Sequence, residues 1–141
     1  MAELIIAIVI FAIMAALSYG AYRQYNEALV TRAAANQVAA DISLARSQAI
    51  KRRGNVSIVV DEPARSYVIR DEAGNVYKTR FFDTDSDLPL RFIETPSPDS
   101  ITFNARGFVV GTLIPVDVGR RNRAFRVTMN AIGRTQITKH P

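Results

Sequence analysis

Residues 1–22 read MAELIIAIVIFAIMAALSYGAY, and this stretch decides the architecture of the chain. After Glu3, nineteen residues from Leu4 to Tyr22 carry no charged side chain. A helix of about 20 apolar residues crosses the roughly 30 Å of hydrocarbon in a bilayer. A secretory signal peptide is the alternative, but no basic segment precedes the run and no cleavage-like break follows it. The stretch therefore predicts an apolar helix that is buried in lipid or against other helices.

Glu3 is the one carboxylate of this stretch and stands at the edge of the apolar run. A carboxylate that is buried among aliphatic side chains costs several kcal/mol, and a contacting cation offsets much of that cost. Two interpretations stay open. Glu3 reaches the lipid headgroups and has no special partner, or it pairs with a positive charge inside a helix bundle and thereby sets the axial register of the helices.

Residues 23–53 continue the helix without proline or glycine and with abundant alanine. Lys51, Arg52 and Arg53 precede Gly54, which is typical of a helix C-terminus. We therefore expect one continuous helix from Leu4 to Arg53 whose second half packs on a sheet. Apolar side chains recur at spacings of three and four along one face of that half: Ala35, Val38, Ile42, Ala45 and Ala49.

Residues 54–141 change to short runs of β-branched and aromatic residues that are separated by turn-forming residues. Six to eight strands are predicted, with hairpin-length links that favour an antiparallel sheet. The runs are Val56–Val60, Tyr67–Arg70, Val76–Phe82, Leu90–Ile93, Ile101–Phe103, Phe108–Val118, Ala124–Met129 and Arg134–Lys139. The fold class is α+β: a long N-terminal α-helix, with an apolar first half (1–22) and an amphipathic second half (23–53), packed on an antiparallel β-sheet domain (54–141).

Six phenylalanines stand beside Val, Ile and Leu in the predicted strands, where alternate positions face the core. We therefore expect them to be buried rather than to form a surface on which nucleic-acid bases stack. They are Phe81, Phe82, Phe92, Phe103, Phe108 and Phe125.

The composition excludes a disordered chain and offers little for catalysis. The chain is 48% hydrophobic and 22% charged, has no cysteine, and its single histidine is His140. A thiolate metal site, a cysteine nucleophile and a Ser-His-Asp triad built on a packed core are therefore not expected. Asp83, Asp85 and Asp87 alternate as in a calcium loop, but the following glycine and the distal glutamate are missing. We expect no enzyme, no metal and no cofactor.

Charge is unevenly distributed along the chain, which has a net charge of +5. Residues 1–60 hold six basic and three acidic side chains, and residues 61–103 hold five basic and nine acidic. Residues 104–141 hold seven basic side chains and one acidic. A molecule that is polarised in this way can pair head to tail with its own copies or attract a polyanion.

An acid at the head of an apolar span, which continues as an amphipathic helix into a small β-domain, resembles the type IV pilin and pseudopilin superfamily. The head ELIIAIVIFAIMAAL is similar to the N-terminal helix of mature pilins. Three further stretches resemble the GspH/FimT-like group of minor pilins and type II secretion pseudopilins: ARSQAIKRRGNVSI, SITFNARG and FRVTMNAIGRTQI. Together these stretches span nearly the whole chain and imply the pilin fold.

The resemblance implies that the protein is a structural subunit of a type IV pilus or a type II secretion-like filament. Such a subunit is a single-pass protein of the bacterial inner membrane that later polymerises with other pilins in an extracellular or periplasmic filament. A prepilin peptidase would remove a basic leader and methylate the new N-terminus, and an assembly platform would add the subunit. We expect this chain to be a mature or trimmed form, with the glutamate at position 3 instead of the usual fifth position.

The resemblance also implies roles for individual residues. Glu3 would pair with the N-terminal ammonium of a neighbouring subunit, at Met1, inside the apolar core of a filament. Small side chains would let the helices of that core approach closely. These are Ala7, Ala12, Ala15, Ala16 and Gly20.

The basic C-terminal region supports an alternative function. Some FimT-like minor pilins take up DNA through a GRxR-type motif near the C-terminus, and this chain has GRTQ at 133–136, without the second arginine. If the GRRNR turn at 119–123 is adjacent, a DNA-binding patch would comprise Arg120, Arg121, Arg123, Arg134 and Lys139. Solvated surface, or contact with an acidic region of a neighbouring subunit, is the simpler interpretation. A periplasmic sensor or enzyme domain on a membrane anchor is a third hypothesis, which the missing catalytic residues disfavour.

Overall fold

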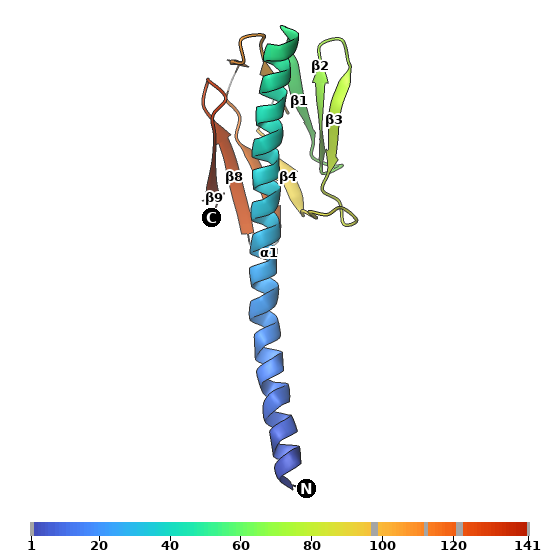
Figure 1. Cartoon of the computed structure of the whole chain (residues 1–141), viewed down its shortest axis with the longest axis vertical. Helices are drawn as coiled ribbons and strands as arrows, with labels where there is room; N and C mark the ends of the chain where they lie inside the picture. Colours follow the sequence, from blue (N-terminus) through green and yellow to red (C-terminus); the bar gives the residue numbers. More distant parts are fainter. Residues whose placement is uncertain (1, 97–98, 112, 121–122, 141) are drawn as a thin grey trace.

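A computed structural model of the chain describes residues 2–96, 99–111, 113–120 and 123–140. Figure 1 shows a long helix whose C-terminal half lies on a β-domain and whose N-terminal half extends far beyond it. The α+β fold class and the expected arrangement of a long helix on an antiparallel domain are therefore confirmed.

Helix α1 spans Ala2–Arg52 without interruption. It ends in a Schellman-type turn, in which the Gly54 amide donates to the Ala49 carbonyl at 3.2 Å and the Arg53 amide donates to the Ile50 carbonyl at 3.3 Å. The left-handed residue of this turn is Arg53, with a φ of 54°. The sequence pointed to Gly54 as the stop, so the helix ends close to the predicted place but with an arginine in the position that favours glycine.

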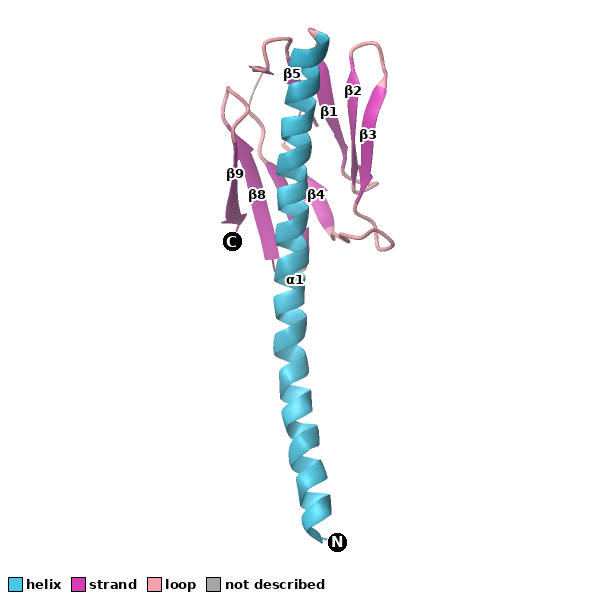
Figure 2. Cartoon of the chain, in the orientation of Figure 1, coloured by secondary structure: helices cyan, strands magenta, loops and turns pink. Residues whose placement is uncertain are grey.

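The strands form two antiparallel sheets over the described residues. The first contains β1 (Val56–Asp61), β2 (Ser66–Asp71), β3 (Val76–Phe81), β5 (Ser100–Phe103) and β6 (Val109–Val110). The second contains β4 (Phe92–Glu94), β7 (Val116–Arg120), β8 (Arg123–Met129) and β9 (Thr135–His140). The strand orders are β3-β2-β1-β5-β6 in the five-stranded sheet and β4-β7-β8-β9 in the four-stranded sheet. Helix α1 contacts strands of both sheets and lies across them (Figure 2).

The predicted strand Phe108–Val118 is wrong as a single element. The structure places Val109–Val110 in the five-stranded sheet and Val116–Arg120 in the four-stranded sheet. Between them Gly111 takes a φ of 91°, and Pro115 has no amide to donate to a strand ladder. The chain therefore leaves one sheet and enters the other inside this apolar run.

The core lies between α1 and the inner faces of both sheets. The helix face that the sequence predicted is buried over its whole length, at Ala35, Val38, Ile42, Ala45 and Ala49. Buried side chains from both sheets belong to the same cluster, among them Ile58, Ile69, Phe103, Val118 and Val127. One apolar face of the helix thus packs against both sheets.

The phenylalanines follow the expected burial only in part. Four are buried or half-buried: Phe82, Phe92, Phe103 and Phe125. Phe81 is 55% exposed and Phe108 is 44% exposed, so the expectation that these two lie in the core is wrong. Phe81 ends an edge strand, and since successive side chains of an extended chain point to opposite faces, the burial of Phe82 leaves Phe81 outside. Phe108 directly follows the turn at Gly107.

Candidate assembly surfaces

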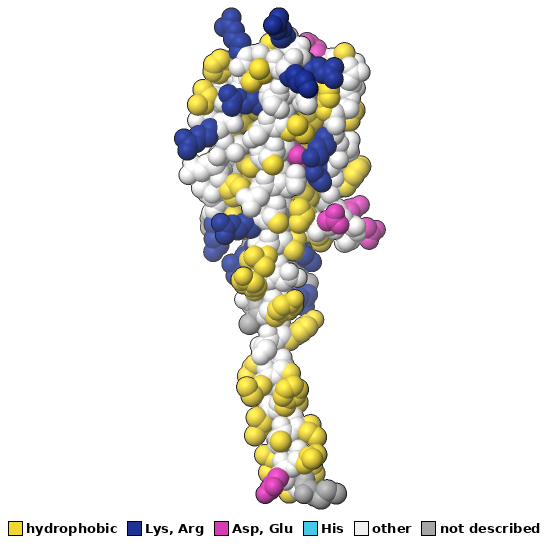
Figure 3. All heavy atoms as spheres, viewed as in Figure 1, with side chains coloured by type: hydrophobic (Ala, Val, Ile, Leu, Met, Phe, Trp, Pro, Cys, Tyr) yellow, Lys and Arg dark blue, Asp and Glu magenta, His cyan; other side chains and the backbone are white. Residues whose placement is uncertain are grey.

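The N-terminal half of α1 is an uncovered apolar rod. The side chains of residues 2–20 are all exposed, including those of Phe11 and Leu17. Figure 3 shows hydrophobic side chains along the whole length of this rod. By length and composition, α1 is long and apolar enough to cross a membrane. Apolar surface of this extent is stable only when lipid or other helices cover it.

Glu3 lies in the first turn of α1, and Figure 3 shows an acidic side chain at the lower end of the rod. A carboxylate in this position also interacts favourably with the partial positive charge of the helix N-terminus. Met1, the expected source of the pairing ammonium, lies outside the described residues. The pairing of Glu3 with a neighbouring N-terminus therefore stays a prediction.

Most of the small residues that were predicted to pack helices lie on one side of the rod. At about 100° per residue, Ala12, Ala16 and Gly20 follow one another at intervals of four and form a stripe, with Ala15 beside it. Ala7 lies on the side opposite Ala16. The stripe is exposed, and small side chains let two helix backbones approach closely. Its role in helix packing stays a prediction.

Tyr19 and Tyr22 mark the point where the rod changes character, a feature that was absent from the sequence-based predictions. Both side chains are exposed, and Arg23 follows them directly. Tyrosines beside a cation are typical of the membrane–water interface, because the ring is apolar and the hydroxyl is hydrated. The length from Glu3 to Tyr22 is roughly 28 Å at 1.5 Å per residue, which matches the hydrocarbon thickness of a bilayer.

The basic residues proposed for DNA binding do not form one patch. Arg120 and Arg123 are paired at the β7–β8 turn, and Lys139 lies near them, opposite Phe125. Arg134 lies at the β8–β9 turn, at the other end of β8 and roughly 20 Å away at about 3.4 Å per residue. Two hairpins that share a strand have their turns at opposite ends, so the condition of adjacent turns is not met. Arg121 lies outside the described residues.

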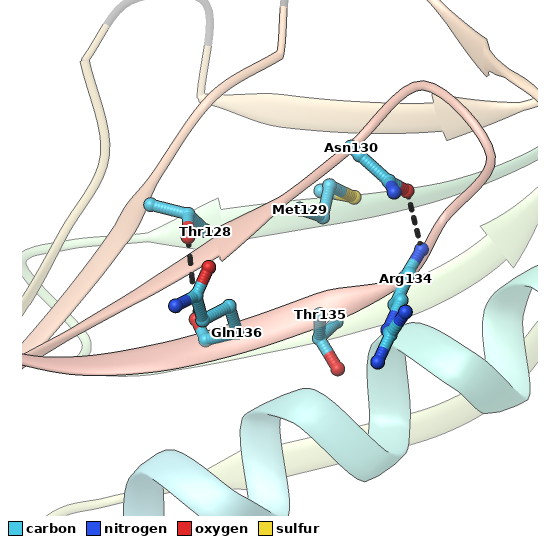
Figure 4. Close-up of a pocket in the computed structure, with 6 residues that line it drawn as sticks. All are labelled: Thr128, Met129, Asn130, Arg134, Thr135 and Gln136. Carbon is cyan, nitrogen blue, oxygen red and sulfur yellow. Dashed lines mark hydrogen bonds between the residues drawn. The ribbon is translucent and has the colours of Figure 1, made fainter.

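The turn that carries Arg134 is held by its own hydrogen bonds and borders an open groove. The Asn130 side chain accepts from the Arg134 amide at 2.8 Å, and the Asn130 amide donates to the Arg134 carbonyl at 3.0 Å. Gly133 takes a φ of 76° between them. The groove has a volume of about 540 Å³ and is lined by Thr128, Met129, Asn130, Arg134, Thr135 and Gln136 (Figure 4). Of these lining residues, Arg134 carries the charge.

Arg126 is neutralised within its own sheet. Its Nε and Nη2 atoms each donate to the Asp117 carboxylate at 2.8 Å, and these hydrogen bonds raise the pKa of the guanidinium. Its Nη2 atom also lies 2.8 Å from Nε2 of His140. These contacts join β7, β8 and β9, and they remove Arg126 from the cations that a partner could use.

A buried charge cluster, which the sequence-based predictions missed, joins α1 to the five-stranded sheet. Asp41 is 2% exposed. Its carboxylate accepts hydrogen bonds from the Tyr67 hydroxyl at 2.6 Å and from Lys78 Nζ at 2.8 Å. The Nε atom of Arg80 lies 3.5 Å from Oδ2 of Asp41, the oxygen that accepts from Tyr67. The signal in the sequence was an acid three residues after Val38, inside the apolar face of the helix.

The cluster keeps Asp41 ionised. Burial by itself would raise the pKa of Asp41, but hydrogen bonds from Lys78 and Tyr67 and the charges of Lys78 and Arg80 outweigh burial and lower the pKa. Burial and the hydrogen bond to Asp41 raise the pKa of Tyr67, which stays neutral. The arrangement is that of a structural ion pair that fixes the helix on the sheet.

Residues 83–88, which we call the acidic loop, connect β3 to β4. The Asp85 and Asp87 side chains are exposed and Asp83 is half-buried. Figure 3 shows acidic side chains that project sideways from the lower part of the β-domain. Over the residues that the structure describes, no group of three or more His, Cys, Asp and Glu side chains is placed to hold a metal ion. The acidic loop therefore presents a negatively charged surface to solvent.

A long helix that is half covered by a β-domain is the pilin fold, which the chain shares with two solved structures. The family described as type II transport protein GspH matches residues 34–133. The chain therefore belongs to the GspH family, which confirms the expected membership in the GspH/FimT-like group of the pilin and pseudopilin superfamily.

Two solved structures have a similar fold. The type IV minor pilin FimU of Pseudomonas aeruginosa is 18% identical, with a TM-score of 0.59 over 85% of this chain and 92% of that chain. The minor pseudopilin EpsH from the type 2 secretion system of Vibrio cholerae is 14% identical, with a TM-score of 0.55 over 77% of this chain and 96% of that chain. No curated protein matches the chain.

Proposed function

We propose that this protein is a structural subunit of a type IV pilus or a type II secretion-like filament. The observation that carries the proposal is the apolar rod, an exposed half-helix that is continuous with a folded domain. Membership of the GspH family and the likeness to a minor pilin and a minor pseudopilin support it. The subunit is held in the bacterial inner membrane by a single span and then assembles through the same span.

The rod is stable in two environments and unstable in water. Burial of one large apolar side chain contributes about 1.5–3 kcal/mol. Large apolar side chains fill most positions from Leu4 to Leu17 and are all exposed, so transfer of the rod to water costs on the order of 20 kcal/mol. Lipid and a bundle of similar rods both cover this surface. A subunit can therefore move from one to the other without exposing it.

The Glu3 carboxylate has different requirements in lipid and in a bundle of rods. At the tip of a membrane span the carboxylate reaches the hydrated headgroups. Inside a bundle of rods the same carboxylate is stable only with a cation in contact. The N-terminal ammonium of a neighbouring subunit would supply that cation, and a pair that forms at one axial position would set the stagger of adjacent rods. Exposure of this ammonium by a prepilin peptidase and addition by an assembly platform belong to the same proposal.

Substitution of Glu3 tests the proposal. In cells that produce the full chain, we expect Glu3→Leu and Glu3→Ala to remain in the inner-membrane fraction. Their recovery in purified filaments should fall at least about tenfold, because loss of one partner of a buried ion pair costs more than the roughly 1.4 kcal/mol that equals a factor of ten. Immunoblots of membrane and filament fractions measure both quantities.

A matched control and the filament itself complete the experiment. Glu94→Ala removes an exposed acid from the β-domain and should leave incorporation unchanged. Recovery of both Glu3 variants in filaments at the unsubstituted level would contradict the role of Glu3 in assembly. Complete absence of the unsubstituted chain from any filament or secretion complex would contradict the proposed function. Its ratio to other subunits in purified filaments distinguishes a main from a minor subunit.

A further inference from the structure

The end of the β-domain that lies farthest from the rod carries exposed apolar side chains among arginines. We call this surface the distal cap. Its apolar members are Ile50, Phe108, Val110 and Ile132, and its cations are Arg46, Arg106 and Arg134. Figure 3 shows Lys and Arg side chains gathered at this end of the molecule.

Contacts between the end of α1 and two turns bring these residues together. Arg46 Nε donates to the Gly107 carbonyl at 3.1 Å. Ile50 packs so closely on Gly107 that a Cβ atom there would lie 2.7 Å from the Ile50 Cδ1 atom. The Val109 amide donates to the Ala131 carbonyl at 3.3 Å, which joins the β5–β6 hairpin to the β8–β9 turn. The distal cap is therefore one continuous surface.

The distal cap is not covered by the rest of the molecule. Ile50 is 46% exposed, and Val110 and Ile132 are each 52% exposed. Among the described residues, neither Arg106 nor Arg134 forms an ion pair. Exposed apolar side chains together with charged side chains are typical of a protein–protein contact.

A complementary surface lies at the opposite end of the five-stranded sheet. Strand β1 begins next to the end of α1, and the antiparallel order of β1, β2 and β3 brings the chain to Phe81 at the far end. The acidic loop begins there, with Asp85 and Asp87 exposed and Leu88 half-buried. Phe81, which is exposed, precedes the segment that carries these acids. This end of the molecule therefore combines negative charge with apolar area, as the distal cap combines positive charge with apolar area.

We propose that the distal cap of one copy binds the acidic loop, together with Phe81, of a second copy displaced along the axis of α1. The inference rests on the proposed function, because filament assembly would bring parallel copies together. The sheets cover α1 from Thr31 to its end at Arg52, a length of roughly 32 Å at 1.5 Å per residue. A displacement of about this length places the lower end of one domain over the distal cap of the next.

The acidic loop lies to one side of α1, and this position makes the contact sterically possible. In Figures 1 and 3 the loop projects away from α1, so the rod of the upper copy can pass beside the lower copy while its loop lies over the cap. Arg106 and Arg134 then face Asp85 and Asp87, and the exposed isoleucine and valine side chains face Phe81.

Apolar area favours a second copy over DNA as the partner. A phosphate backbone is bound by cations and polar donors, and it would leave Ile50, Val110 and Ile132 in water. Arg120 and Arg123, which a DNA-binding patch would need, lie at the other end of β8. A second copy would use both the charges and the apolar side chains of the cap.

Cysteine cross-linking between full-length chains tests the contact. The chain has no native cysteine, so Ile132→Cys in the cap and Thr84→Cys in the acidic loop give a defined pair. The two variants are produced together with different tags, and intact filaments are treated with a short bismaleimide. We expect a dimer that carries both tags. Thr79→Cys, which is exposed on β3 outside the loop, is the matched control and should give much less product with Ile132→Cys.

A second cysteine pair separates failure of this inference from failure of the proposed function. Ala12→Cys and Ala16→Cys, in differently tagged chains, report whether rods pack against one another. Cross-linking between the rods without cross-linking between the distal cap and the acidic loop overturns the inference but not the proposed function. Absence of both products, with the chain still recovered in the purified filaments, overturns the inference and leaves the proposed function standing. Absence of the chain from the filaments themselves overturns the proposed function.

Charge exchange tests the chemistry of the contact. We expect Arg106→Glu with Arg134→Glu to lower the cap–loop yield about fivefold, equal to about 1 kcal/mol for exposed ion pairs. Addition of Asp85→Lys and Asp87→Lys to the same chain should restore the yield, and failure to restore it overturns the pairing. A short fluorescent DNA duplex provides the last comparison. Salt-sensitive binding that Arg106→Glu with Arg134→Glu abolishes, without any cap–loop product, would assign the cap to a polyanion and overturn the proposal.

Discussion

At the scale of single residues, Asp41 holds α1 on the five-stranded sheet. Asp41→Ala leaves the Tyr67 hydroxyl and the Lys78 amine without their shared acceptor. Lys78 and Arg80 are each 32% exposed, so water compensates in part and the expected loss is about 2–3 kcal/mol of unfolding free energy. Thermal unfolding of the full chain in detergent, followed by circular dichroism, measures it. Asp85→Ala, in the exposed acidic loop, is the control and should change stability by less than about 0.5 kcal/mol.

The contribution of Asp41 also has a defined pH dependence. The carboxyl has an ordinary pKa of 3.8, and the folded protein lowers it. A lowered pKa means that the stabilisation is fully present well above pH 3.8 and is lost as the pH falls through the folded pKa. Acidification from neutral pH should therefore destabilise the unsubstituted protein more than Asp41→Asn. Unfolding curves at a series of pH values compare the two, and parallel pH profiles would show that Asp41 contributes no pH-dependent stabilisation.

The same residue shows where reasoning from sequence stops. The apolar face around Val38 and Ile42 is a local pattern, and it predicted the buried side of the helix correctly. Asp41 lies in that face, but its partners Tyr67, Lys78 and Arg80 come from strands that only the folded chain brings near. A charged residue inside an apolar stripe indicates that a partner exists; it does not identify the partner.

At the scale of elements, the turn that ends α1 places an arginine, Arg53, where glycine would be more stable. Arg53 takes a left-handed conformation with a φ of 54°, which costs a non-glycine residue about 1 kcal/mol. Arg53→Gly should therefore stabilise the protein by up to about 1 kcal/mol. Arg52→Gly is the matched control, since it places glycine at the last helical residue and removes the guanidinium whose Cζ atom lies 5.2 Å from the centroid of the Tyr77 ring. It should destabilise by about 1 kcal/mol, and the same sign for both changes would refute this account of the helix end.

The elements themselves were largely predictable because their patterns are local. Helix α1 ends within a residue of the predicted place, and most predicted strands are present. The division into two sheets was not predictable, because it depends on pairings such as β1 with β5, which are distant in sequence. For the same reason the apolar run at 108–118 gave no sign that its two ends belong to different sheets.

At the scale of the whole molecule, the candidate surfaces differ in how far the sequence describes them. The apolar rod and Glu3 occupy one continuous segment, so sequence alone places the charge at the tip. The basic C-terminal residues depend on hairpin register, which separates Arg134 from Arg120 and Arg123 and joins it to Arg46 and the end of α1. The distal cap is assembled from three segments and could be recognised only in the folded protein.

Helix α1 runs from the apolar rod to the domain core without a break, and this continuity has a mechanical consequence. A domain on a flexible tether would tumble above the bilayer and would have to lose that freedom on joining a fibre. Under the proposed function, the helix that anchors the protein is also the helix on which both sheets pack, so each subunit holds its β-domain at a fixed distance from the bilayer before it joins a filament. In a filament of this kind, force applied to the β-domain would likewise be transmitted along the backbone hydrogen bonds of α1 to the rod.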